Sequence, residues 1–147
     1  MQKLQILVLL ILALVLTSCG LDRSNPLDPE NNGINPPEKV REIEVISSGQ
    51  GVVNKWIRIS WDPLEDSEAD GYYVYRSRSY DGTYQRINVI ESFAVEFYND
   101  RNNISPGAYF YRMSAFKYVI PGSQDEEDRL EGPLTPNDYG IGIIVPQ

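Results

Sequence analysis

Apolar and polar residues alternate along most of the chain after residue 38, in short segments separated by turn-forming residues. Alternation with a period of two predicts β-strands, because successive side chains of a strand point to opposite faces of a sheet. The pattern predicts seven short strands and no helix, at residues 40–46, 55–61, 71–77, 84–87, 93–97, 109–115 and 139–145. An all-β chain of this kind is expected to fold as a two-sheet sandwich.

The same alternation separates an inner face of each strand from an outer one. The apolar set of the first strand is Val40, Ile43 and Val45, and the step of three between its first members predicts a bulge. The residues predicted to form the core of the other strands include Trp61, Tyr72, Val74, Tyr109 and Tyr111. The outer face of strands 71–77 and 109–115 then presents Tyr73, Tyr75, Phe110 and Arg112.

Four segments in this order resemble the signature segments of fibronectin type III domains. They are ISWDP at 59–63, GYYVYRS at 71–77, YND at 98–100 and PGAYFYRMSA at 106–115. The resemblance implies an immunoglobulin-like sandwich over residues 38–147, with Trp61 in the core and Tyr109 as a tyrosine corner. It also implies a recognition or spacer module rather than an enzyme. The chain departs from the family at about residues 119–132, where an acidic insertion precedes the last strand.

The first nineteen residues have a different pattern. Lys3 precedes an apolar run at 4–16, which ends in the small residues Thr17 and Ser18 before Cys19. This arrangement is typical of a secretory signal peptide at residues 1–18 and is too short for a comfortable membrane span. An ordinary signal peptide or an uncleaved anchor would give a similar apolar run.

The segment LTSC at 16–19 resembles the lipobox of bacterial lipoproteins. The resemblance implies cleavage before Cys19, a covalent lipid on its sulfur and a membrane anchor in the bacterial cell envelope. Cys19 is the only cysteine, so it has no disulfide partner within the chain. Gly20 replaces the aspartate that, by the same resemblance, would favour the inner membrane, so the outer membrane is favoured.

Residues 19–37 are predicted to be the lipidated cysteine and a flexible tether. They contain the segments NPLDPENNG and NPP, in which proline removes backbone donors and asparagine and glycine favour turns. A short recognition motif is the alternative interpretation of the first segment.

Composition limits the chemistry that the chain can perform. The formal net charge of −8 becomes −9 when residues 1–18 are removed, since the loss of Lys3 leaves 12 basic residues against 21 acidic ones. Such a surface argues against a nucleic-acid partner. The chain has no histidine, and its one cysteine is predicted to carry lipid, which excludes histidine-based triads and ordinary zinc sites. We therefore expect no enzyme activity and no cofactor beyond the lipid.

Two acidic loops are expected at the same end of the sandwich, because the resemblance places the second–third and sixth–seventh strand connections together. Their carboxylates could form a solvated rim, contact a basic protein or, more weakly, hold calcium, although no stretch has the spacing of a dedicated calcium loop. The residues of this predicted acidic pole are Asp66, Glu68, Asp70, Asp125, Glu126, Glu127 and Asp128.

The second candidate surface is the predicted outer face of Tyr73, Tyr75, Phe110 and Arg112. Aromatic side chains and arginine are favoured at protein interfaces, flat rings also stack on sugars, and the same residues could simply pair across strands. The sequence thus predicts a non-enzymatic, lipid-anchored binding or assembly module that docks onto another envelope protein. A glycan-binding surface lipoprotein that uses exposed aromatics is the alternative.

Overall fold

The computed structural model describes residues 33–66, 68–136 and 140–147. The predicted signal segment, Cys19 and residues 19–32 of the predicted tether lie outside the described residues, as does Tyr139 at the start of the last predicted strand. Within the described part of the chain, no helix is both long and apolar enough to span a membrane.

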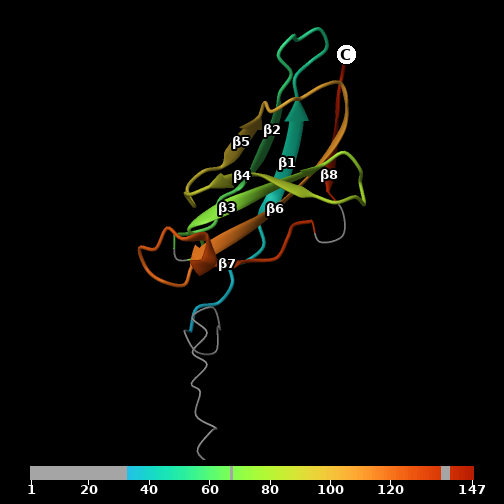
Figure 1. Cartoon of the computed structure of the whole chain (residues 1–147). Helices are drawn as coiled ribbons and strands as arrows, with labels where there is room; N and C mark the ends of the chain where they lie inside the picture. The colour runs from blue at the N-terminus through green and yellow to red at the C-terminus, as the bar shows by residue number, and fades with distance from the viewer. Residues whose placement is uncertain (1–32, 67, 137–139) are drawn as a thin grey trace, which may run out of the picture.

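Two antiparallel sheets pack face to face as a sandwich (Figure 1). The three-stranded sheet has the order β1 (Arg41–Ser47), β2 (Ile57–Asp62), β5 (Phe97–Asp100). The five-stranded sheet has the order β4 (Gln85–Ile90), β3 (Gly71–Ser77), β6 (Gly107–Tyr118), and β6 pairs along its other edge with β7 (Arg129–Glu131) and β8 (Ile141–Val145). The predicted all-β, two-sheet fold class is therefore confirmed.

The predicted and observed strand positions agree best where the alternation is longest. Strand 71–77 coincides with β3, and the bulge predicted in the first strand lies between Arg41 and Glu44, where Glu42 has a positive φ of 48°. The strand predicted at 93–97 is wrong, because β5 begins at Phe97 and continues to Asp100. Pairing with β2 decides this position, since it places Tyr98 beside Ile59 and Asp100 beside Ile57.

The last strand position of the five-stranded sheet is filled by two short strands. β8 pairs with the first half of β6, from Gly107 to Tyr111, and β7 pairs with its last three residues. Thr135 bridges to Met113 between them. The predicted insertion at 119–132 is thus partly wrong, because its end at 129–131 is a strand. Buried backbone donors and acceptors along the second half of β6 need partners, and β7 supplies them.

The core lies between the two sheets and contains Trp61, Tyr72, Val74, Tyr109 and Tyr111. The Trp61 and Tyr72 rings meet edge to face at 5.2 Å between centroids. Tyr109 makes the contacts of a tyrosine corner: its hydroxyl donates to the Ser105 carbonyl at 3.1 Å and accepts from the Ser105 amide at 2.9 Å.

Asp100 on β5 connects the sheets through a buried polar network. Its carboxylate is fully buried and accepts from the Tyr111 hydroxyl at 2.8 Å and from Arg76 at 2.7 Å. Burial, together with the negative charge of Asp100, raises the pKa of Tyr111. Two strands of one sheet are thereby held to one strand of the other.

The two ends of the sandwich differ. The described chain enters at Gly33, at the end that also holds β7 and the β6–β7 connection (Figure 1). Pro37, predicted to belong to the tether, is buried, and its carbonyl lies so close to Gly132 that a Cβ there would be 2.5 Å away. The β1–β2 hairpin loop projects from the opposite end.

Candidate binding surfaces

The outer face of the five-stranded sheet is covered rather than open around Tyr73. Tyr73 is only 2% exposed, so its predicted exposure is wrong. Its ring lies 4.8 Å from that of Phe116, and the Arg86 guanidinium lies over it at 4.8 Å. Alternation assigned Tyr73 to the outer face, but side chains from neighbouring strands close over that face.

Arg129 on β7 forms part of this cover. Its side chain is 6% exposed, and its guanidinium lies 4.6 Å from the ring centroid of Phe116 and 5.1 Å from that of Tyr118. It donates to the Tyr118 hydroxyl at 2.8 Å and pairs with Glu91 at 2.5 Å. We call Tyr73, Arg86, Phe116, Tyr118 and Arg129 the covered face.

Tyr75 lies beside the covered face and is half-buried. Its hydroxyl donates to Oε1 of Glu131 at 2.7 Å, and the Ser114 hydroxyl donates to the same oxygen at 2.5 Å. Burial and then the hydrogen bond to the Glu131 carboxylate raise the pKa of Tyr75. Its polar end is thus already engaged within the sheet.

Phe110 and Arg112 are also half-buried and engaged. The Phe110 ring meets Tyr80 at 5.7 Å, while Arg112 donates to the Pro136 carbonyl at 2.7 Å and lies over the Tyr84 ring. The structure does bring the four predicted outer residues to one face, and register pairs Tyr75 with Arg112. They do not form the predicted exposed aromatic stripe.

The two predicted acidic loops do meet at one end of the sandwich. Asp70 accepts from the Tyr118 amide at 2.7 Å through its carboxylate, and its own amide donates to the Phe116 carbonyl at 2.8 Å. The N-terminal segment lies at the same end, where residues 33–38 line a pocket with Glu68 and Lys117. The acidic pole therefore faces the side from which the chain enters.

Several carboxylates of the acidic pole have partners within the chain. Glu126 pairs with Arg86 at 2.5 Å, Asp128 accepts from the Ser123 hydroxyl at 2.5 Å, and Glu68 accepts from the Glu65 amide at 3.1 Å. The exposed members are Asp66, Asp125, Glu126 and Glu127. Among the residues that the structure describes, no three carboxylates are grouped closely enough to hold a metal ion.

The outer face of the three-stranded sheet is open, and sequence reasoning did not single it out. Ile46 is 52% exposed and Phe97 is 44% exposed. Arg58 lies between them, with its guanidinium 4.8 Å from the Phe97 ring centroid and its Nε donating to Asn99 at 3.0 Å. The sequence does indicate the exposure of Ile46, because alternation from the inward Val45 places Ile46 on the outer face. We call Ile46, Arg58 and Phe97 the open face.

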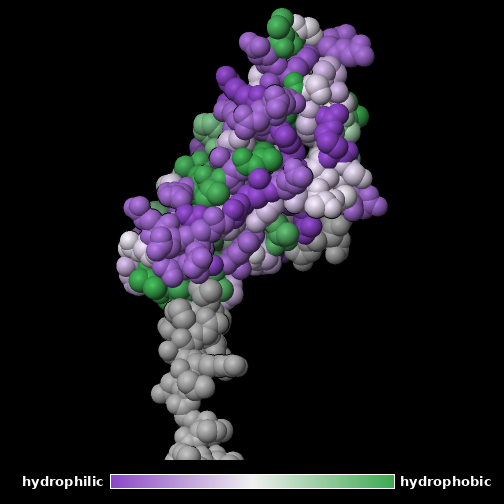
Figure 2. Space-filling view, in the orientation of Figure 1, coloured by the Kyte–Doolittle hydropathy of each residue, from purple (hydrophilic) through white to green (hydrophobic). Residues whose placement is uncertain are grey.

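A shallow depression of about 360 Å³ lies on the open face, and its lining also includes Glu44 and Glu96. Further along the same strands, the β1–β2 hairpin loop exposes Val53 at 92% and Val52 at 38%. Figure 2 shows this apolar tip at the end of the molecule away from the chain entry. The largest exposed apolar side chains thus include a group on β1, β5 and the hairpin.

The comparisons with known proteins show no family for this chain. No protein-family model matches the chain. No curated protein matches it either. Among solved structures, the FN1–FN3 domains of chicken CNTN1 are similar at 17% identity and a TM-score of 0.47, over 76% of this chain. The chain spans about a third (34%) of that structure. The two sheets themselves define an immunoglobulin-like two-sheet sandwich.

Proposed function

We propose that this chain is a non-enzymatic, lipid-anchored module of the bacterial cell envelope that docks another envelope protein through its open face. The observation that carries the docking surface is the exposure of Ile46 and Phe97 on either side of Arg58. Aromatic side chains and arginine are enriched at interface centres, and apolar groups gain most from desolvation there.

The orientation of the domain favours this surface over the acidic pole. If Cys19 carries the lipid, the chain reaches the sandwich at Gly33, beside the acidic loops (Figure 1). The acidic pole would then face the anchoring membrane. The hairpin tip with Val52 and Val53 would point away from it, toward a partner.

The chemistry of the open face supports one kind of partner. It fits a partner whose apolar side chains pack on Ile46 and Phe97, on either side of the Arg58 guanidinium. Glu44 and Glu96 also line the depression on this face, so a partner with basic residues beside its apolar side chains gains electrostatic complementarity.

Site-directed photo-cross-linking in intact cells tests the docking proposal. A photoreactive amino acid at Phe97 or Val53 should cross-link to one recurrent envelope protein, which mass spectrometry would identify. The same amino acid at Tyr80, which is 51% exposed in the turn between β3 and β4, serves as the matched control. Equal capture from Tyr80, or no protein captured from either Phe97 or Val53, would contradict docking through the open face.

A second measurement separates anchoring from docking. Cys19→Ser removes the only cysteine, so incorporation of a labelled fatty acid should be lost and the chain should leave the membrane fraction. Retention of the label would contradict lipidation at Cys19 without bearing on the open face.

A further inference from the structure

A pocket at the edge of the five-stranded sheet has the opposite electrostatic character to the rest of the molecule. It has a volume of about 500 Å³ and lies between the end of β3, the β3–β4 turn and the loop before β6. Its lining contains Arg76 and Arg78 but no aspartate or glutamate. Three other surface pockets are each lined by two acidic residues. A carboxylate-free pocket is notable on a chain with a net charge of −8.

The two arginines of this pocket have different roles. Arg76 donates to the buried carboxylate of Asp100 at 2.7 Å and to the Asn102 carbonyl at 3.0 Å, so its charge is balanced within the fold. Arg78 is exposed, and among the described residues no carboxylate forms an ion pair with it. The pocket therefore offers one positive charge to a ligand.

The position of Arg78 is fixed by packing rather than by an acid. Its guanidinium lies over the Tyr109 ring at 4.0 Å from the centroid, and a Cβ at Gly107 would come within 2.7 Å of its Nη2. Tyr109 is itself held by the tyrosine corner with Ser105. Stacking leaves the N–H groups at the guanidinium edge for a carboxylate, which they can bind with two parallel hydrogen bonds. Preorganisation of this kind lowers the entropy cost of binding.

The remainder of the lining is neutral and rich in hydrogen-bonding groups, contributed by Ser77, Ser79, Thr83, Gln85 and Asn103. Ser77 Oγ accepts from the Ser79 amide at 3.1 Å, and Ser79 Oγ donates to Asp81 on the turn beside the pocket. Hydroxyl and amide side chains of this type match the hydroxyl groups of a sugar ring. The volume lies within the ~300–1,000 Å³ that is usual for small-ligand sites.

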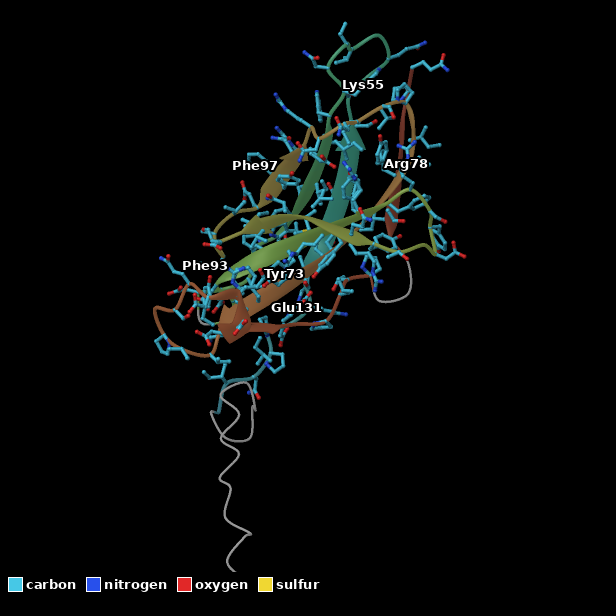
Figure 3. The ribbon with its side chains drawn as sticks, in the orientation of Figure 1. Lys55, Tyr73, Arg78, Phe93, Phe97 and Glu131 are labelled. Carbon is cyan, nitrogen blue, oxygen red and sulfur yellow. The ribbon has the colours of Figure 1, made fainter. Side chains whose placement is uncertain are left out.

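We propose that this pocket binds an acidic sugar, with its carboxylate on Arg78 and its ring hydroxyls on the neutral side chains of the lining. A single available charge fits a carboxylate, which carries one negative charge, better than a phosphate, which carries nearly two. This site is independent of the docking function proposed above, because none of its lining residues belongs to the open face. Figure 3 shows Arg78 and Phe97 on different sides of the sandwich.

Ligand-observed NMR on the full chain in detergent micelles tests this proposal with four probes at matched ionic strength: glucuronate, glucose, acetate and inorganic phosphate. Glucuronate should bind with a Kd of order 1 mM, a weak affinity expected of one monosaccharide at an open site. Glucose has the ring hydroxyls but no carboxylate, and acetate has the carboxylate but no ring. Each should bind at least ten-fold more weakly than glucuronate. Phosphate should also bind more weakly than glucuronate.

Two arginine variants locate the binding. Arg78→Gln should weaken glucuronate binding at least ten-fold, whereas Arg58→Gln should leave it unchanged. Arg58 is the matched control, because it is also an exposed arginine stacked on an aromatic ring. Equal binding of glucuronate and glucose, stronger binding of phosphate, or full binding by Arg78→Gln would each overturn the proposal. The comparison of the four probes on the unchanged chain does not depend on the stability of either variant.

Discussion

The outer faces of the two sheets carry similar residues but differ in how far their aromatic rings are exposed. Each presents aromatic rings with an arginine stacked on them: Phe116 with Arg129 on one sheet, and Phe97 with Arg58 on the other. The first ring is fully buried, whereas Phe97 is 44% exposed. The contrast shows that residue type alone does not decide whether an aromatic face becomes part of the fold or part of a surface.

The difference arises from the neighbours that each strand acquires in its sheet. β6 continues into a connection that returns as β7 and places Arg129 across the rings of Phe116 and Tyr118. β5 is a short edge strand that pairs only with β2 in the described structure, so no further strand brings side chains over Phe97. The covered face is therefore expected to contribute to stability, and the open face to binding. Two predictions test this division, and a third tests the burial of Tyr75 beside the covered face.

The largest difference is expected between two aromatic truncations. Tyr73→Ala should lower the free energy of unfolding by about 3 kcal/mol, because it leaves a cavity under Arg86 and beside Phe116. Phe97→Ala should lower it by less than about 1 kcal/mol, because that ring is already partly in water. Urea unfolding of both variants measures this, and equal losses would remove the distinction between the two faces.

The paired arginines should show a smaller difference in the same direction. Arg129→Gln removes two ring contacts, the hydrogen bonds to Tyr118 and the ion pair with Glu91, for an expected loss of about 2 kcal/mol. Arg58→Gln, at an exposed position, should cost less than about 1 kcal/mol.

Both arginine variants are compared by chemical denaturation at low and high salt. The Arg129 loss should persist at high salt, because its groups are largely shielded from water. Disappearance of that loss would show that surface charge, rather than packing, holds the cover in place.

The smallest expected effect is a change in the alkaline pH dependence of stability. The pKa of Tyr75 is raised in the folded chain by burial and by Glu131, so the unfolded chain releases this proton first as pH rises. Its contribution to stability is fully present below about pH 10, the ordinary tyrosine pKa, and decreases at higher pH. Tyr75→Phe should therefore reduce the decline in stability above that pH. Urea midpoints at successive alkaline pH values measure this. An equal decline in stability for Tyr75→Phe and the unchanged protein would contradict the prediction.

Several features of the fold could be predicted because they depend on local pattern. The inward positions of Tyr72 and Val74 result from period-two alternation, and the β1 bulge results from the step between Val40 and Ile43. The exposure of the candidate binding surfaces was harder to predict. Tyr73 was assigned to the correct face of β3, but its burial depends on Arg129, which is 56 positions further along the chain.

The pocket around Arg78 could not be predicted from the neighbouring sequence either. Arg78 comes directly after β3, Asn103 lies in the loop before β6, and Tyr109 stands on β6 between them in space. Nothing in the sequence near Arg78 indicates that Asp100 neutralises Arg76 and leaves Arg78 to face the pocket. Pairing of β3 with β6 places Arg78 over Tyr109, and packing of the two sheets brings Asp100 of β5 to Arg76.

The sequence by itself determined the strand periodicity, the two-sheet class, the core residues Trp61 and Tyr109, and the absence of histidine and of a second cysteine. These properties depend on composition and on alternation over a few neighbouring residues. Only the tertiary structure decided which outer face is covered, where the last strand is interrupted and which arginine is balanced by a carboxylate. Those outcomes depend on contacts between segments far apart in the chain, and a local pattern does not specify which segments will meet.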